Sequence, residues 1–278
     1  MTRHGRRRSR PETRPRAPVA VVVAGVIGAA LFALPLFGLI WRVPWSELGA
    51  VLGDESSRTA LRLSLWCSLW AGAISVLAGV PLAWLLARVR FRGRAATRAL
   101  CTLPMVLPPV VGGVALFFAF GRRGVVGQYL DRWFDVRLPF TTWGVVMAQA
   151  FVAMPFLILT VEAALRQVDP QIEDAARSLG ASPWYVFRRV TLPTIRPALI
   201  AGAVLAWARA LGEFGATITF AGSFPGRTQT LPLAVYLALE TDPRAALVLS
   251  LVLVTVSFAV LIALRDHWFS GASRLVDR

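Results

Sequence analysis

Long apolar runs separated by short polar segments dominate the hydropathy pattern of the chain. These runs cover residues 19–41, 60–87, 99–120, 140–165, 195–221 and 245–264. A helix needs about 20 apolar residues to cross the hydrocarbon core of a bilayer, so the pattern predicts an all-α, polytopic membrane protein with about six transmembrane helices. The first run is too long for the apolar region of a signal peptide and lacks a small-x-small exit, so we expect an uncleaved span.

The third run contains residues that interrupt a helix. Pro104, Pro108 and Pro109 are followed closely by Gly112 and Gly113. Broken backbone hydrogen bonds are tolerated inside a membrane only where protein or a water-filled cavity satisfies the freed groups. The run is therefore either a bent helix that lines a pathway or a kinked packing helix.

The fifth run contains two ionisable residues, Arg209 and Glu213, within an apolar stretch. A charged residue at the centre of a membrane helix costs about 2.5–3.5 kcal/mol on insertion scales, so neither is expected to face lipid. At i, i+4 spacing the two can pair on one helix face. They are interpreted as part of a pore or gate, or as a structural pair, and Gly212 and Gly215 would let another helix approach closely.

The polar segment 169–193 separates the fourth and fifth runs and reads as two short helices. Asp169 followed by Pro170, and Ser182 followed by Pro183, both match a capping residue and a first-turn proline. Gly180 suits the left-handed position that ends the first helix, and we expect Pro193 to end the second. On spacing alone, the segment is either an ordinary loop or a knuckle that a partner's groove encloses.

Composition narrows the class of protein. The 278 residues are 56% hydrophobic with a mean hydropathy of +0.61, which is typical of a membrane protein. All 30 basic residues are arginine, so the chain cannot supply the lysine of an ATP-binding P-loop. The two cysteines and two histidines lie far apart, which argues against a disulfide, a metal site or an enzyme, and we expect no catalytic residue and no cofactor in this chain.

The arginines also predict orientation and domains. With the N-terminus inside, twenty arginines fall in inner segments and nine in outer ones, so both termini are expected in the cytoplasm. Residues 1–18 would form a basic, disordered cytoplasmic tail that contacts anionic lipid rather than nucleic acid. Residues 19–54 would form the first span and an external loop, 55–265 the main domain, and 266–278 a cytoplasmic tail. Segment 223–244 is expected outside, where it plugs the outer mouth, meets a partner or merely connects two spans.

Segment 174–193 resembles the EAA motif of the permease subunits of bacterial ABC importers, E-A-A-x3-G-x9-I-x-L-P. The match starts with Asp174-Ala175-Ala176, continues with Gly180 and ends with Val190-Thr191-Leu192-Pro193. Asp in place of Glu and Val in place of Ile are mild departures. The resemblance implies a type I importer permease fold in which this loop forms a coupling helix pair. Its ATPase-contacting residues would be Asp174, Ala175, Ala176, Gly180, Ser182, Val190, Leu192 and Pro193.

Further segments over residues 55–265 are similar to those of molybdate permeases. They are LPMVLPPVVGG (103–113), FGRRGVVGQYL (120–130), ALGEFGATITFAG (210–222) and TQTLPLAVY (228–236). The resemblance implies import of molybdate, with tungstate left open, across the bacterial cytoplasmic membrane. It also implies a homodimer, a cytoplasmic ATPase dimer that binds ATP and Mg²⁺, and an external molybdate-binding protein. The pathway or gate would include Arg209, Glu213, Gly212, Gly215, Pro108 and Pro109.

Two alternatives stay open at this stage. Sulfate and thiosulfate permeases share the ALGEFGA-like stretch and would differ only in substrate. A membrane scaffold or sensor could use segment 169–193 to bind a cytoplasmic partner without moving a solute. The broken spans and the arginine within an apolar helix disfavour a scaffold, because it has no need of them.

Overall fold

The computed structural model describes residues 18–272, with side chains as far as Val260 and at Ile262. The chain divides into two units that meet at Val43 and Pro44. The first unit contains one described helix, α1 (Val19–Arg42), which confirms the first predicted helix. Apart from Pro18, the predicted N-terminal tail lies outside the described residues, as do the last six residues of the predicted C-terminal tail.

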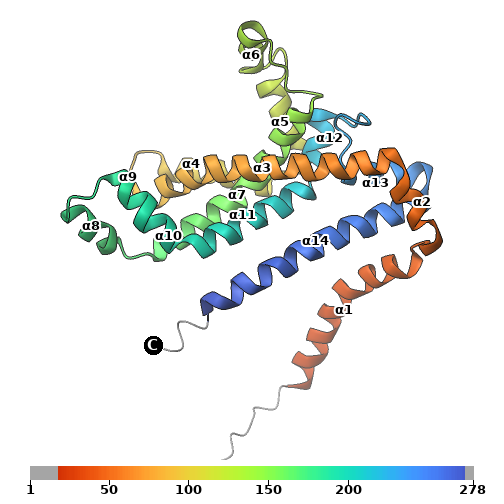
Figure 1. Cartoon of the computed structure of the whole chain (residues 1–278), viewed down its shortest axis with the longest axis horizontal. Helices are drawn as coiled ribbons and strands as arrows, with labels where there is room; N and C mark the ends of the chain where they lie inside the picture. Colours follow the sequence, from red (N-terminus) through yellow and green to blue (C-terminus); the bar gives the residue numbers. More distant parts are fainter. Residues whose placement is uncertain (1–17, 273–278) are drawn as a thin grey trace, which may run out of the picture. The chain divides into compact units, whose positions relative to one another are not determined.

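The regular secondary structure of the second unit's described part consists of helices joined by loops (Figure 1). Its long helices are α3 (Glu55–Arg88), α7 (Thr142–Gln167), α11 (Arg196–Leu211) and α14 (Pro243–Ala272). Shorter α-helices are α2 (Leu48–Gly53), α4 (Arg94–Val106), α5 (Pro109–Phe120), α6 (Gly127–Phe134), α8 (Pro170–Ser178), α9 (Pro183–Val186), α10 (Leu192–Thr194), α12 (Gly215–Ala221) and α13 (Leu231–Thr241). A 3₁₀ turn covers Trp45–Glu47 and a π-helix covers Phe187–Thr191.

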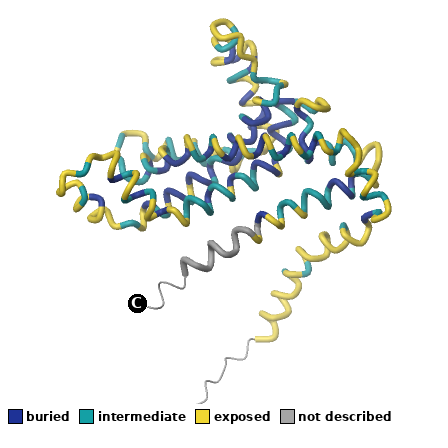
Figure 2. Tube along the Cα trace, viewed as in Figure 1, coloured by how far each residue is buried: buried dark blue, intermediate teal, exposed yellow. Residues whose placement is uncertain are grey.

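Helix α7 is the central helix of the second unit. It packs against α3, α11 and α12, and dark blue buried positions follow its length in Figure 2. Small residues permit these contacts: a Cβ at Gly79 of α3 would lie 2.7 Å from Cδ2 of Leu157. Helices in a bilayer associate through close van der Waals packing, which small residues favour. The core is thus a tightly packed group of helices around α7.

Polar groups at the two ends of α3 fix where this helix starts and stops. At the start, Asp54 accepts a hydrogen bond from the backbone N–H of Ser57 at 3.1 Å, which is N-capping. At the end, Nε of Arg94 donates to the carbonyl of Leu86 at 2.7 Å and satisfies an acceptor of the last turn. The predicted second span, residues 60–87, lies inside the observed helix.

Two of the six predicted spans are not continuous helices. The third, residues 99–120, is divided into α4 and α5, because Pro108 interrupts the backbone and Leu107 is extended. The fifth, residues 195–221, is divided into α11 and α12 by residues 212–214. Among the described residues, four helices are long and apolar enough to cross a membrane, or five if the pair Pro183–Thr194 and Arg196–Leu211, bent by 76°, counts as one.

The segment predicted as an external loop, residues 223–244, contains the apolar helix α13. This helix packs on α14 and α3, and its Leu231 and Leu233 are buried. The N–H of Leu231 donates to Oγ of Ser64 at 2.6 Å, which anchors the start of α13 to α3. The segment is therefore an integral part of the core, and sequence analysis underestimated its helical content because the run is only eleven residues long.

Loop 121–139 contains α6 and a small surface network of charges. Nε of Arg137 and Nε of Arg122 donate to the two carboxylate oxygens of Asp131 at 2.7 and 2.9 Å. The hydrogen bonds from Arg137 and then Arg122 hold the pKa of Asp131 below its usual value. Because the arginines are exposed, this network orders the loop and contributes little to global stability.

The two interrupted spans pack directly against each other through glycines. A Cβ at Gly113 of α5 would lie 2.6 Å from Cβ of Thr219 in α12, and a Cβ at Gly215 would lie 2.7 Å from Cβ of Pro109. Both distances are too short for a real side chain. Only glycine therefore allows the two short helices to approach this closely.

We predict that two neighbouring glycine substitutions change the stability to different extents. Gly215→Ala should lower the free energy of unfolding by about 1–3 kcal/mol, because the new methyl group overlaps Pro109. Gly212→Ala is the matched control and should change it by less than about 0.5 kcal/mol, because Gly212 is exposed and its nearest neighbour is 3.8 Å away. Thermal unfolding in detergent measures both, and equal effects would contradict the close packing of α5 on α12.

Candidate coupling and translocation sites

Segment 169–193, called the proposed coupling segment below, begins with helix α8. This helix ends in a Schellman motif. Gly180 has φ +86°, and its N–H donates to the carbonyl of Arg177 at 2.9 Å, while the N–H of Ala181 donates to that of Ala176 at 3.2 Å. At the start of α8, Asp169 accepts from the N–H of Gln171 at 2.9 Å. The predicted cap at Asp169 and the left-handed turn at Gly180 are both present.

The second helix of the segment contains a π-helix, Phe187–Thr191, which was not predicted from the sequence. Ser182 caps α9 by accepting from the N–H of Tyr185 at 3.3 Å, and the helix continues as a π-helix and then α10. Pro193 does not end the helix, which runs one residue further to Thr194 before the 76° bend into α11. Single π turns often occur at functional sites, and this one ends at the buried Thr191.

The apolar face of α8 points away from the rest of the chain. Leu179 is 89% exposed and Ile172 is 51% exposed, although both have the spacing of buried residues. Asp174 forms an ion pair with Arg177 in its own helix at 3.0 Å and is otherwise in solvent. Ala175 is exposed and Ala176 is partly so. The motif residues of α8 thus form an accessible surface, whereas Val190 and Leu192 in the second half of the motif are partly buried.

The predicted pair in the fifth run is present at the break between α11 and α12. Nη1 of Arg209 lies 2.7 Å from Oε2 of Glu213, which is only 1% exposed. Oε1 of Glu213 accepts from the N–H of Ala216 at 2.8 Å. The carboxylate therefore satisfies a free amide at the start of α12 while its charge is balanced by Arg209.

The structure brings together some of the predicted pathway residues and separates others. Pro109 contacts Gly215, and Pro108 precedes α5 at the interruption, so the two broken spans meet there. Arg209 and Glu213 form the pair described above. Gly212 is exposed, and no other helix of this chain comes within 4 Å of a Cβ placed there, so its predicted role in close helix packing stays a prediction.

Two carboxylates at the polar end of the core are buried, which was not predicted from the sequence. Glu162 of α7 accepts from Arg98 of α4 and from Arg166, with a shortest distance of 2.5 Å to Nη2 of Arg98. Glu173 of α8 is 3% exposed and pairs with Arg88 at 3.1 Å. A signal existed for Glu162, because an ionisable residue in an apolar run is rarely lipid-facing and Arg166 follows at i+4.

The fold and this surface together define a class of protein. The chain has helices long enough to span a membrane, and two of the predicted spans are interrupted. An exposed helix pair lies between α7 and α11. These features are typical of the membrane subunit of a transporter. The chain belongs to the family described as binding-protein-dependent transport system inner membrane component, whose model matches residues 79–271.

Curated relatives narrow the comparison further. The chain is 46% identical over 245 residues to the molybdenum transport system permease protein ModB of Mycobacterium tuberculosis, covering 88% of this chain and 92% of that protein. It is 34% identical over 238 residues to the sulfate transport system permease protein CysT of Escherichia coli, covering 84% and 86%.

A solved structure supports the fold. The chain is similar to a bacterial alginate ABC transporter crystallised with an alginate pentasaccharide-bound periplasmic protein. The TM-score is 0.70 at 20% identity, over 89% of this chain and 92% of that chain. The expected importer permease fold is confirmed, and the transmembrane helix count of six is not.

We predict that the Arg209–Glu213 pair is energetically coupled. Arg209→Gln should lower the free energy of unfolding by about 2 kcal/mol or more, because it leaves the buried carboxylate of Glu213 without its counter-charge. The double variant with Glu213→Gln should lose less than the sum of the two single variants, since the glutamine can still accept from Ala216. Detergent unfolding curves of the three variants measure the cycle, and simple additivity would contradict a direct pair.

Proposed function

We propose that this chain is the membrane permease subunit of an ATP-driven importer of molybdate, with tungstate as a second possible cargo. The observation that carries the proposal is the 46% identity, over most of both chains, to a protein named as a molybdenum transport permease. The exposed coupling helix pair and the interrupted helices supply the mechanical parts that such a subunit needs. The chain would lie in the bacterial cytoplasmic membrane with both termini inside.

The proposed assembly contains two copies of this chain and two kinds of protein partner. Two cytoplasmic ATPase subunits, which bind ATP and Mg²⁺, would each receive one helix pair, and an external binding protein would deliver the anion. The exposed residues Ile172 and Leu179 support a cytoplasmic partner, because an apolar surface of this kind is unfavourable in water. Membrane lipid surrounds the remaining apolar surface, and no nucleic acid takes part.

In the proposed mechanism, closure of the ATPases moves α8 and α9 as a lever. The movement would pass to α5 and α12, which are short helices of 12 and 7 residues, each followed by a glycine. Packed elements with two alternative arrangements convert small displacements into opening and closing. Gly180 provides the sharp turn, and Ala175 and Ala176 allow close docking.

The permease needs no tight site for the anion. Transport requires that the permease bind the anion weakly, so that the anion can leave. An external binding protein would supply the selectivity for the anion. Arg209 contributes positive charge near the pathway, but Glu213 neutralises much of it at 2.7 Å. We infer that the pair acts mainly as a gate element and that the dipoles of the short helices assist the anion.

The sulfate alternative rests on the 34% identity to CysT, which is lower than the identity to ModB over a similar share of the chain. The scaffold alternative is disfavoured by the glycine contacts between α5 and α12, which a static scaffold does not require. Competition between molybdate and sulfate distinguishes a molybdate importer from a sulfate importer. ATP-dependent uptake of either anion distinguishes an importer from a scaffold.

We predict ATP-dependent uptake of molybdate into vesicles that contain this chain with its ATPase and binding protein. Uptake should survive a large excess of sulfate, because selection among tetrahedral oxyanions lies in the binding protein and in the pathway that it feeds. Loss of uptake to sulfate would move the assignment to a sulfate importer. Absence of uptake of either anion by an assembled complex would contradict the oxyanion assignment.

We further predict that Gly180 tolerates asparagine but not valine. Its φ of +86° costs a side-chain-bearing residue about 1–2 kcal/mol, and asparagine adopts this region more readily than a β-branched residue. A Cβ at Gly180 meets no atom of this chain within 4 Å, so no clash inside the permease opposes either side chain. Gly180→Val should insert normally but lose most ATP-driven uptake and ATPase binding, whereas Gly180→Asn should retain both. Equal uptake by the two variants would rule out a requirement for the left-handed turn.

A further inference from the structure

Glu173 differs from the other acidic residues of the coupling segment. Its carboxylate is buried, with 3% of the residue exposed, whereas Asp169 and Asp174 lie in solvent. Burial of a charge is unfavourable unless the charge is paired and hydrogen-bonded. The position is therefore held by specific partners, although Glu173 is not one of the residues of the motif pattern.

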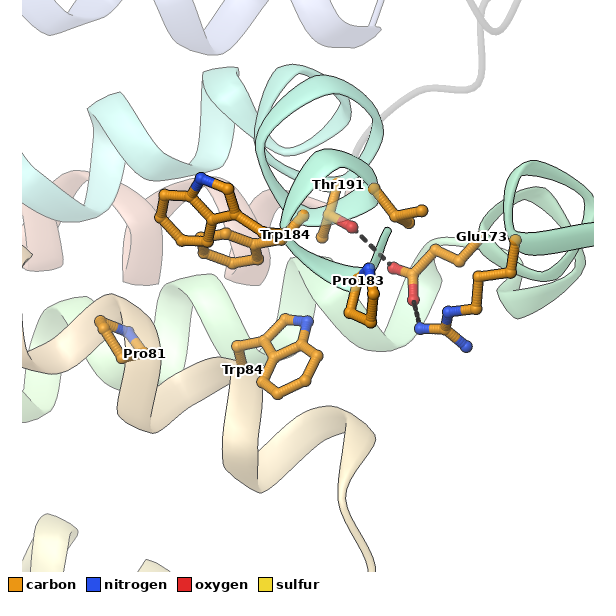
Figure 3. A pocket seen from close by; sticks show the side chains of 9 residues that line it. Pro81, Trp84, Glu173, Pro183, Trp184 and Thr191 are labelled. Atoms are coloured by element: carbon orange, nitrogen blue, oxygen red, sulfur yellow. Dashed lines mark hydrogen bonds and ion pairs between the residues drawn. The ribbon is translucent and has the colours of Figure 1, made fainter. Parts of the chain in front are cut away.

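Three side chains from different parts of the chain surround this carboxylate. Oε1 of Glu173 accepts from Oγ1 of Thr191 at 3.0 Å and from Nη2 of Arg88 at 3.1 Å. Oε2 lies 3.6 Å from Nη2 of Arg177, one turn further along α8. Figure 3 shows Glu173 turned toward Thr191 across the space between the two helices of the segment. One carboxylate thus joins α8, the π-helix and the end of α3.

Arg88 strengthens this connection, because it also reaches the beginning of the segment. Its Nη2 donates to the carbonyl of Val168 at 3.2 Å, immediately before α8. The Arg88 side chain is 13% exposed, so its bonds compete with little water. The last residue of α3 therefore holds the point where α7 ends and the helix that follows.

The aromatic contacts on the other side of the segment are less complete. Trp84 of α3 meets Phe187 edge to face at a centroid distance of 6.0 Å, and Trp184 stacks on Phe187 at 5.7 Å. An open cavity of about 440 Å³ lies between these rings and Pro81, with Glu173 at its edge (Figure 3). Loose aromatic packing alone does not fix the angle between α3 and the helix pair. The polar contacts of Glu173 supply the directional part of the junction.

We propose that Glu173 is a positioning residue for energy coupling, which makes α3 and the two helices of segment 169–193 move as one rigid body. The inference rests on the proposed function, because it assigns a role within ATP-driven transport. With the carboxylate in place, α3 moves together with segment 169–193 when a partner displaces this segment. Without it, α8 pivots on its own, and the partner's movement is absorbed in the segment.

The test compares Glu173→Gln and Arg88→Gln with Arg90→Gln in the full complex reconstituted in vesicles. Arg90 is exposed and lies two residues from Arg88, which makes it a matched control for loss of one arginine. Glu173→Gln and Arg88→Gln should each reduce the number of anions imported per ATP hydrolysed by about tenfold, and the double variant should lose no more than either single one. Arg90→Gln should keep the wild-type ratio. A wild-type ratio in Glu173→Gln would overturn the proposal.

A spin label at Gln171→Cys supplies a readout that is independent of transport. In a Cys101→Ser background the remaining Cys67 is buried, so the label reports on α8. Glu173→Gln should sharpen the spectrum, which indicates greater mobility of α8, and an unchanged spectrum would overturn the proposal. If Glu173→Gln does not accumulate, Thr191→Val keeps both charges and should give an intermediate increase; wild-type mobility there would count against it. Absence of uptake by the wild-type complex would refute the proposed function, while the spectra would still decide the role of Glu173.

Discussion

The need to satisfy backbone polar groups inside a bilayer is the constraint on which the rest of this structure depends. An interrupted helix exposes free N–H and C=O groups, and lipid offers them no partner. The protein places its two interruptions in helices that pack on each other, α5 and α12. Glu213 satisfies the amide of Ala216 at one break, and Arg209 balances the charge that this requires. Interrupted helices are thereby stable and remain short enough to move.

Near the end of α3 and the start of α4, the buried groups that need partners are carboxylates instead of backbone amides. Two buried carboxylates, Glu162 and Glu173, pair with arginines from the region where α3 ends and α4 begins. Arg94 of α4 also caps the last turn of α3. The helix that leads into the break before α5 is therefore fixed to the helix that carries the coupling segment. These ion pairs and hydrogen bonds connect the proposed ATPase-docking surface with the broken spans, and double-variant cycles are the means to measure that coupling.

Much of the architecture could be predicted from the sequence, because apolar length and capping residues act locally. The helix starts at Asp169 and Ser182 and the turn at Gly180 follow from side chains within three residues of each site. The breaks in the third and fifth runs were recognisable as weak points, but their extent depends on which helix packs there. The contact of Gly215 with Pro109 joins residues more than a hundred positions apart, and no local pattern encodes it.

The burial of the carboxylates also could not be predicted from a local sequence pattern. Glu173 sits next to Asp174 in a polar helix, and sequence gives no reason to bury one and expose the other. The distinction arises only when Arg88 and Thr191, from opposite sides in sequence, approach the same oxygen. The motif resemblance predicts which segment couples to the ATPase, and the structure identifies the contacts that attach this segment to the rest of the chain.

The central claim is that movement of the coupling segment rearranges the interrupted helices. It is tested most directly by the distance between spin labels at Val106→Cys in the two permease copies of the proposed assembly, because Val106 is 84% exposed at the end of α4 beside the break. The account predicts one distance without nucleotide and a clearly different one with ATP trapped in the ATPase subunits. The same distance in both states, in a complex that hydrolyses ATP and imports its anion, would contradict it.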